Sequence, residues 1–222
     1  MSAGAVVSIA RDGADAARAA LERTIGSGGV AVFPADGLYG LACDPLNPDA
    51  IARVHELKGR DDGKPSAVMY FAPLILRELL GGLGHATREA LAALLPGPVT
   101  VVVHNAERRY PLACREDPER LGIRLIEGPL TGAACPVLQT SANFSGEPAP
   151  ASFRELVPAI RDGADLAIDG GQLTGLPSTV VDLTGLETGG EGSRWSILRH
   201  GAMPEAEVAR RLAALASHRA AN

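Results

Sequence analysis

The chain has 222 residues, of which 46% are hydrophobic and only 4% aromatic, and its formal net charge is −5. This length and apolar content exclude a disordered chain and suffice for one large core, so we expect a single domain over residues 1–222. The negative charge disfavours a protein that coats nucleic acid through a basic face. No apolar run approaches the roughly 20 residues that cross a bilayer, and the first residues show no signal-peptide pattern. We therefore expect a cytoplasmic protein without a membrane partner.

Short runs rich in Val, Ile and Leu recur along the chain. Runs this short and continuously apolar are typical of strands that are buried on both faces. The predicted strands are residues 5–9, 30–33, 66–71, 99–103, 122–126, 136–140, 165–168, 178–183 and 195–199.

Helical patterns, many rich in alanine, lie between these runs. The predicted helices are residues 14–26, 48–57, 86–95, 151–161 and 204–217. Asn47 and Pro48 form a good start signal for the second, because Asn caps a helix and Pro fits its first turn. Helices and strands do not alternate strictly, which favours an α/β fold with a mixed sheet. The glycine-rich residues 185–193 are predicted to be an exposed loop.

Several common catalytic motifs are absent. The GSGG segment at 26–29 precedes a strand instead of following one, and no G-K-S/T accompanies it, so we interpret it as a helix stop. His55-Glu56 lacks the second histidine of a zincin, and Ser145-Gly146 lacks the G-x-S-x-G frame. The cysteines Cys43, Cys114 and Cys135 form no C-x-x-C pair, so we expect reduced, buried thiols. Chemistry here must come from positioning and charge neutralisation, without a covalent nucleophile.

The chain uses arginine almost everywhere, and its only lysines, Lys58 and Lys64, lie in one stretch with Arg60. An ammonium group binds phosphate as a compact point charge, and Gly59 lets the backbone turn so that neighbouring cations face one polyanion. The alternative is a solvated loop with exposed charges.

Polar residues also follow or interrupt the predicted strands. Ser141 and Asn143 come directly after the strand at 136–140, where ligands bind in open α/β sheets; the alternative is an Asx turn that satisfies its own backbone. Thr100 follows the rigid Leu95–Pro98 turn, whose default role is structural.

Arg124 interrupts an apolar strand, and an arginine there is costly to bury without a partner. It must therefore meet either a substrate anion or an acid of the chain. If the substrate is its partner, we expect no carboxylate of the chain within ion-pair distance. Ser178 and Thr179 open another strand and Arg199 ends one; their alternative roles are a strand-start hydroxyl and a solvated strand end.

Five regions in register resemble the YrdC family, and the resemblance covers about residues 15–203. They are FPADGLYGLACD at 33–44, HELKGRDDGKPS at 55–66, LPGPVT at 95–100, TSANFSGEP at 140–148, and STVVDLT at 178–184 with ILRHG at 197–201. The resemblance implies a single-domain α/β fold: an open, twisted, mixed parallel and antiparallel sheet, flanked by helices, with a concave ligand cleft.

It also implies an ATP-dependent enzyme that uses Mg²⁺ and makes threonylcarbamoyl-AMP from L-threonine, bicarbonate and ATP, with release of pyrophosphate. A downstream tRNA threonylcarbamoyl transferase machinery would use this product. By match to the family pattern, the residues that serve ATP are Lys58, Arg60, Lys64, Ser141, Asn143, Ala149 and Arg199. Those at the amino-acid end are Ala35, Met69, Arg124, Ser178 and Thr179. We expect Lys58, Arg60, Ser141 and Arg199 to converge in one cleft.

The chain departs from the family pattern at the amino-acid end. Ala35 and Gly37 stand where two threonines are usual, Ser66 replaces a leucine, and Met69 replaces a histidine. Two alternatives therefore stay open: a YrdC-like paralogue that adenylates a different carbamoyl or amine substrate, and a YrdC-type RNA-binding module. Net acidity and the lack of interleaved aromatic residues count against the RNA-binding module.

Overall fold

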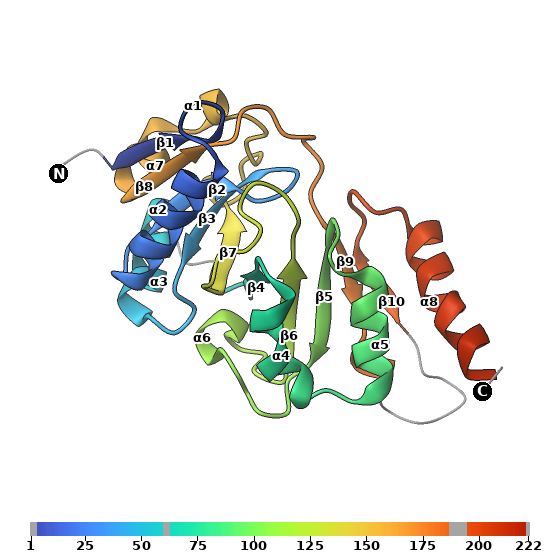
Figure 1. The fold of residues 1–222 in the computed structure, drawn as a ribbon. Helices are drawn as coiled ribbons and strands as arrows, with labels where there is room; N and C mark the ends of the chain where they lie inside the picture. Colours follow the sequence, from blue (N-terminus) through green and yellow to red (C-terminus); the bar gives the residue numbers. More distant parts are fainter. Residues whose placement is uncertain (1–3, 60–62, 187–194, 221–222) are drawn as a thin grey trace.

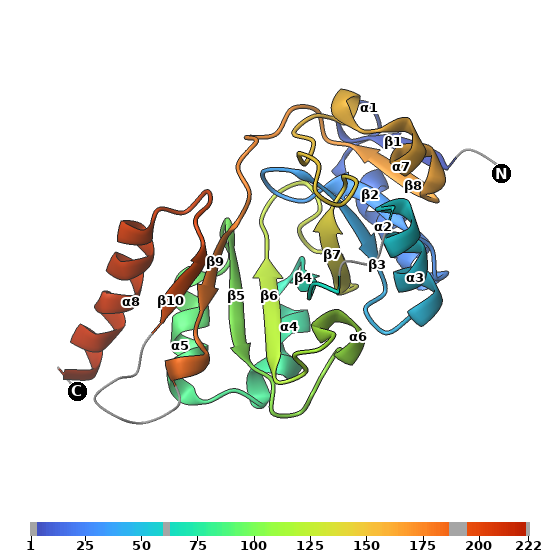
Figure 2. The same cartoon turned by 180° about the vertical axis from the view of Figure 1, so that it is seen from behind.

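The computed structural model describes residues 4–59, 63–186 and 195–220 (Figures 1 and 2). Its strands are β1 (Ala5–Ser8), β2 (Ala31–Pro34), β3 (Tyr39–Cys43), β4 (Ala67–Tyr70), β5 (Val99–His104), β6 (Arg120–Leu125), β7 (Val137–Ser141), β8 (Leu166–Asp169), β9 (Thr179–Asp182) and β10 (Ser196–Arg199). Its helices are α1 (Ile9–Asp12), α2 (Ala14–Gly26), α3 (Pro48–Leu57), α4 (Pro73–Gly81), α5 (His85–Leu94), α6 (Pro111–Cys114), α7 (Pro158–Gly163) and α8 (Glu205–Ala220), with 3₁₀ turns η1 (Phe153–Glu155) and η2 (Thr184–Leu186).

All strands of the described residues join one sheet in the order β1-β8-β2-β3-β7-β4-β6-β5-β9-β10. The β1–β8, β2–β8, β4–β6 and β5–β9 pairs are parallel, and the other neighbours are antiparallel. The predicted mixed sheet is therefore confirmed. Every predicted strand is present, with ends that differ by at most two residues.

The strand β3 was not predicted. Its sequence, Tyr-Gly-Leu-Ala-Cys, contains glycine and alanine, which have low strand propensity. It is nevertheless fully buried between β2 and β7. The space at Gly40 is tight, because a Cβ atom would lie 2.9 Å from Gln139 Nε2 and 3.0 Å from the Thr140 carbonyl oxygen. Tertiary packing, and not local propensity, therefore makes this strand.

Helices flank the sheet in separate groups. Figure 1 shows α4 and α5 in front of β6, β5, β9 and β10, and Figure 2, seen from behind, shows the opposite face of these strands uncovered by helices. Helices α2 and α3 accompany the N-terminal strands, and α8 packs beside α5. The prediction missed α1, α4 and α6, and it replaced η1 and α7 with one helix.

Local signals explain the ends of the helices. The Asn47 side chain accepts hydrogen bonds from the backbone N–H groups of Asp49 and Ala50, both at 3.0 Å, as predicted for the cap of α3. Helix α2 ends at Gly26, and Gly28 follows with a φ of 77°, so the glycine segment does stop the helix. Most of the predicted loop at 185–193 lies outside the described residues.

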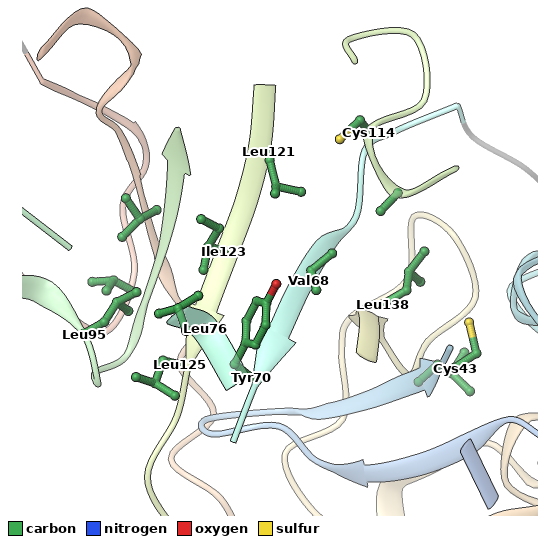
Figure 3. Close-up of a cluster of buried hydrophobic side chains, with 14 of the residues drawn as sticks. Cys43, Val68, Tyr70, Leu76, Leu95, Cys114, Leu121, Ile123, Leu125 and Leu138 are labelled. Carbon is green, nitrogen blue, oxygen red and sulfur yellow. The ribbon is translucent and has the colours of Figure 1, made fainter. Parts of the chain in front are cut away.

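The core consists of two apolar clusters. The larger includes Val68 and Tyr70 of β4 with Ile123 and Leu125 of β6 (Figure 3). The smaller contains Met69 of the same strand. Because alternate residues of β4 enter different clusters, this central strand is buried on both faces.

The predictions about thiols and membranes can be compared with the described residues. Cys43 and Cys114 are buried, Cys135 is partly buried, and all three are free thiols. Burial raises the pKa of Cys43 to about 12 and that of Cys135 to about 11, so neither is a reactive thiolate at neutral pH. None of the described helices is long and apolar enough to cross a membrane.

Candidate functional site

A cleft of about 560 Å³ lies where the central strands meet the loops that follow β2, α3, β7 and β8. The sequence-predicted site residues on its wall are Ala35, Lys58, Lys64, Arg124, Ser141, Asn143, Ser178 and Arg199. Residues far apart in sequence meet here because β7 inserts between β3 and β4, and β9 pairs with β5. The expected convergence of Lys58, Ser141 and Arg199 is therefore seen, while Arg60 lies outside the described residues.

Strand register brings the floor of the cleft together. Val101 of β5 pairs with Ile123 of β6, which places Thr100 opposite Arg124 on the other face of the sheet. Thr100 also pairs with Val180 of β9. A hydroxyl and a guanidinium from different strands thus face the same space.

Lys58 connects the end of α3 to the loop after β7. Its ammonium group donates to the carbonyl oxygens of Ser141 at 2.7 Å and Asn143 at 3.1 Å, and only 8% of the residue is exposed. In return, the Ser145 N–H donates to the Lys58 carbonyl oxygen at 3.0 Å. Lys58 therefore holds the Ser141–Ser145 loop and gives the cleft a positive charge.

Asn143 shapes the same loop. Its side-chain N–H₂ group donates to the backbone carbonyl oxygens of Phe144 and Glu147, and its Oδ1 lies 3.5 Å from Lys58 Nζ. This is the local turn that was the alternative to ligand binding. Asn143 lines the cleft, but its amide hydrogens are already used by the chain.

A second polar group joins β5, the start of β9 and β10. Thr100 Oγ1 and Ser178 Oγ are 2.8 Å apart, and Arg199 Nη2 donates to Ser178 Oγ at 3.0 Å and to the Ser178 carbonyl oxygen at 2.9 Å. Burial lowers the pKa of Arg199, which nevertheless stays charged at neutral pH. The group presents two hydroxyls next to a cation.

Arg124 is the most buried cation of the cleft, with a side chain only 6% exposed. Its Nη1 donates to Gln139 Oε1 at 3.1 Å and lies 3.5 Å from the Ala35 carbonyl oxygen, while Nη2 lies 3.3 Å from Asp36 Oδ2. The expectation that no acid of the chain would lie within ion-pair distance is therefore wrong. The ion pair faces the cleft instead of a closed core, so it does not reduce Arg124 to a packing residue.

Burial dominates the electrostatics of this ion pair. Burial lowers the pKa of Arg124 to about 10. The positive charge of Arg199 acts in the same direction, whereas the negative charge of Asp36 acts to raise this pKa. Burial also raises the pKa of Asp36 above its usual range, and the attraction of Arg124 offsets this only in part. Both groups are therefore less stable in their charged forms than they would be in water.

Three predicted site residues do not line the cleft. Met69 is fully buried in the smaller apolar cluster, because β4 is covered on both faces. The Thr179 hydroxyl donates to the Met203 carbonyl oxygen at 2.6 Å and accepts from the Met203 N–H at 3.0 Å, so it fixes the chain after β10. Ala149 is half-buried in the loop after β7. We find no contact of these residues with the described cleft.

Other residues in or beside the cleft were not singled out from the sequence. Gln139 and Asp36 contact Arg124 from β7 and from the β2–β3 turn. Arg120, two positions before Gly122, pairs with Asp182 at 2.6 Å across the sheet. The predicted strands were correct, but the pairing order that joins these residues cannot be read from local patterns. A period of two along β6 would have placed Arg120 and Arg124 on one face.

Gly37 is held tightly by the segment after β8. A Cβ atom on Gly37 would collide with the Leu176 carbonyl oxygen, and the Gly175 N–H donates to the Gly37 carbonyl oxygen at 2.9 Å. Leu176 itself lines the cleft and is 53% exposed. The departure from the family threonine at Gly37 therefore accompanies a close approach of this segment to the cleft.

The mixed sheet and its cleft, with buried cations beside hydroxyls, define an α/β protein whose cleft has the side chains that an anionic ligand requires. The sequence profile of the Sua5/YciO/YrdC family, described as "Telomere recombination", matches residues 23–201. The chain belongs to this family.

Individual relatives are consistent with that assignment. The threonylcarbamoyl-AMP synthase of Xanthomonas campestris pv. campestris (strain B100) is 33% identical over 154 residues, which are 66% of this chain and 82% of the relative. The structure of P. abyssi Sua5 complexed with L-threonine has a TM-score of 0.76 at 24% identity, over 93% of this chain and 60% of that chain. E. coli YciO has a TM-score of 0.75 at 23% identity, over 94% of this chain and all of that chain. At these identities the two structures support the fold alone.

Proposed function

We propose that the protein is an L-threonylcarbamoyladenylate synthase, which converts L-threonine, bicarbonate and ATP into threonylcarbamoyl-AMP and pyrophosphate. The observation that carries the proposal is the meeting of Lys58, Ser141, Arg124, Ser178 and Arg199 in one cleft, in a chain whose curated relatives are threonylcarbamoyl-AMP synthases. P. abyssi Sua5, which shares the fold, has been crystallised with L-threonine.

We assign the two substrates to different parts of the cleft. Lys58, Lys64 and Ser141 surround the end of α3 and β7, and we assign the triphosphate to them because cations and hydroxyls stabilise phosphate oxygens. Arg124 and Ser178 lie at the other end of the floor, and we assign the threonine carboxylate and carbamate to them. Arg199 donates hydrogen bonds to Ser178 and also lines the cleft.

The proposed reaction needs no protein nucleophile. The threonine amine and bicarbonate form a carbamate with loss of water, and a carbamate oxygen then attacks the α-phosphorus of ATP. The bond from the α-phosphorus to the bridging oxygen breaks, and pyrophosphate leaves with that electron pair. Lys58, Lys64 and Arg199 would stabilise the growing negative charge by position alone.

Magnesium is assigned to the substrate, as MgATP. Across residues 4–59, 63–186 and 195–220, no group of three or more His, Cys, Asp or Glu side chains is arranged to hold a metal ion. These residues therefore do not fit a metal site built by the protein itself, and no step above passes through one.

A second candidate function keeps the same chemistry with a different amine. The loss of hydroxyls at Ala35 and Gly37, with Leu176 at the mouth of the cleft, favours it. Use of the product by a tRNA threonylcarbamoyl transferase and direct contact with RNA are further expectations of the proposal.

The test is bicarbonate-dependent pyrophosphate release from ATP, screened over the proteinogenic amino acids and small amines, with the adenylate identified by mass spectrometry. Turnover with threonine supports the proposal. Turnover only with another amine supports the second candidate function, and no turnover with any amine contradicts both.

A further inference from the structure

Most of the N–H groups of the Arg124 guanidinium are already occupied or out of reach. A guanidinium has five N–H donors. Nη1 serves Gln139 and lies near the Ala35 carbonyl oxygen, and Nη2 serves Asp36. Nε is buried without a partner, so solvent and ligands cannot reach it. An incoming carboxylate can bind Arg124 in a bidentate manner only if a group of the chain leaves.

Asp36 is the group that is most easily replaced. It is the only acid that the described residues place within ion-pair distance of Arg124, so its exchange for a substrate carboxylate conserves the local charge. Its contact measures 3.3 Å, which is longer than the 2.6 Å between Arg120 and Asp182 but shorter than the 3.6 Å between Arg120 and Asp117. Charge-assisted hydrogen bonds usually measure about 2.7 to 2.9 Å.

The surroundings of Asp36 also make it a weak partner. Its backbone φ is 79°, in the left-handed region that costs energy for a residue other than glycine. Burial raises the pKa of its carboxyl group in spite of Arg124. The Asp36 carboxylate is therefore held beside Arg124 against a solvation cost, whereas the backbone cost stays the same wherever the side chain points.

Asp36 has space into which it can turn. Asp36 lines a second, smaller pocket of about 190 Å³ together with Gly97, Pro98, Ile126 and Glu127. A rotation about the side-chain torsions can move the carboxylate toward this pocket without a change in the backbone. Glu127 opposes a long stay there by charge repulsion, which would return Asp36 to Arg124 when the ligand leaves.

We propose that Asp36 is an internal substitute for the substrate carboxylate, so that amino-acid binding at Arg124 is an exchange of one carboxylate for another. The inference rests on the proposed function, which assigns the amino-acid carboxylate to Arg124. It adds a specificity-determining residue: ligands without a carboxylate cannot make the exchange, and the affinity of those with one is reduced by the competition.

The test compares the binding of L-threonine and L-threoninamide to the full chain by calorimetry. Asp36→Asn keeps the shape of the side chain and accepts the left-handed backbone, and Asp36→Gly removes the competitor completely. We expect both variants to bind L-threonine about fivefold more tightly, since a partly exposed ion pair contributes up to about 1 kcal/mol. L-Threoninamide, which lacks the carboxylate, should show no gain.

Asp117→Asn is the matched control, because Asp117 lines the same cleft but pairs with Arg120 at 3.6 Å. If Asp117→Asn tightens threonine binding as much as Asp36→Asn does, the effect is one of net charge and the exchange is refuted. Weaker threonine binding by both Asp36 variants would show that Asp36 is a clamp that orients Arg124, and would also overturn the exchange. No threonine binding by the wild type or either variant would overturn the exchange together with the threonine assignment. Adenylate formation by the wild type with unchanged affinity in the variants would overturn the exchange alone.

Discussion

Arg124 has the clearest functional consequence among single residues. Its side chain is buried, and it contacts two neutral oxygens and the Asp36 carboxylate. Replacement by methionine removes a charged hydrogen-bond donor from the substrate, and such bonds contribute about 1.5 to 3 kcal/mol. We expect Arg124→Met to lower the kcat/KM for threonine by about tenfold to a hundredfold.

A control separates lost recognition from lost stability. Arg124→Met leaves the half-buried Asp36 carboxylate without its cationic partner, and this loss alone lowers the stability of the folded protein. The double variant Arg124→Met/Asp36→Asn removes that cost. If the double variant folds and retains wild-type turnover, the ion pair is purely structural and Arg124 does not bind the substrate.

The raised pKa of Asp36 also affects stability. Because burial makes the pKa of the folded state higher than that of the unfolded state, the folded protein binds this proton more tightly. The contribution of Asp36 to stability is therefore present below the unfolded pKa and is lost as the pH rises through the folded pKa. We expect Asp36→Asn to be more stable than the wild type at pH 7, with a smaller difference at pH 4, in urea unfolding at both pH values. A wild type that is more stable than the variant at pH 7 would contradict this sign.

At the scale of elements, the segment after β8 sets the shape of the amino-acid end. Gly37 tolerates no side chain because of the Leu176 carbonyl oxygen, whereas Ala35 lines the cleft directly. Gly37→Thr should therefore lower the thermal midpoint by several degrees, as expected for a backbone collision of about 1 to 3 kcal/mol.

Ala35→Thr tests the missing hydroxyl without that collision. A neutral hydrogen bond contributes about 0.5 to 1.5 kcal/mol, so we expect the preference for threonine over serine to change by about twofold to tenfold while ATP binding stays constant. If Ala35→Thr leaves this preference unchanged, position 35 does not contact the side chain of the substrate.

Elements were predicted better than their contacts. The buried strands and most helices follow from apolar runs and caps such as Asn47, because those signals are local. Strand β3 was missed because its glycine and alanine have low strand propensity, and its burial between β2 and β7 comes from tertiary packing. Lys58 was identified because lysine is rare in this chain, and Arg124 because it is a charged residue within an apolar strand. Their partners Asp36 and Gln139 could not be predicted, because β4 lies between β6 and β7 and no sequence pattern specifies that order.

At the scale of the whole molecule, the cleft is lined by residues from distant parts of one sheet. Lys58 and Ser141 come from the side of β3 and β7, and Ser178 and Arg199 from the side of β9 and β10. A ligand that bridges both sides stabilises the folded state by mass action, by about 2.7 kcal/mol at a concentration 100 times its Kd. We expect ATP to raise the thermal midpoint by about 5 to 10 °C.

Two variants test the origin of that shift. Lys58→Ala should lose most of the ATP-induced shift, because the Ser141–Ser145 loop loses its tie and the cleft loses a cation. Arg53→Ala removes a cation that lies outside the cleft and pairs with Asp165 at 2.9 Å. This variant should have a lower thermal midpoint without ATP, but ATP should raise that midpoint as much as in the wild type. Equal shifts in both variants would contradict the assignment of ATP to Lys58.

The order of strands also has a consequence for synthesis on the ribosome. Among the described residues, β1 pairs with β8 alone, and one edge of β5 pairs with β9. These early strands are therefore synthesised long before their partners. Until the partners are synthesised, the nascent chain exposes unpaired strand edges, which favour aggregation. Folding of the sheet is also expected to be slow, because the paired strands are far apart in sequence. The cleft draws on residues from Ala35 to Arg199. The proposed ATP site is therefore incomplete until nearly all of the sheet has been synthesised, so ATP binding cannot stabilise the chain before that point.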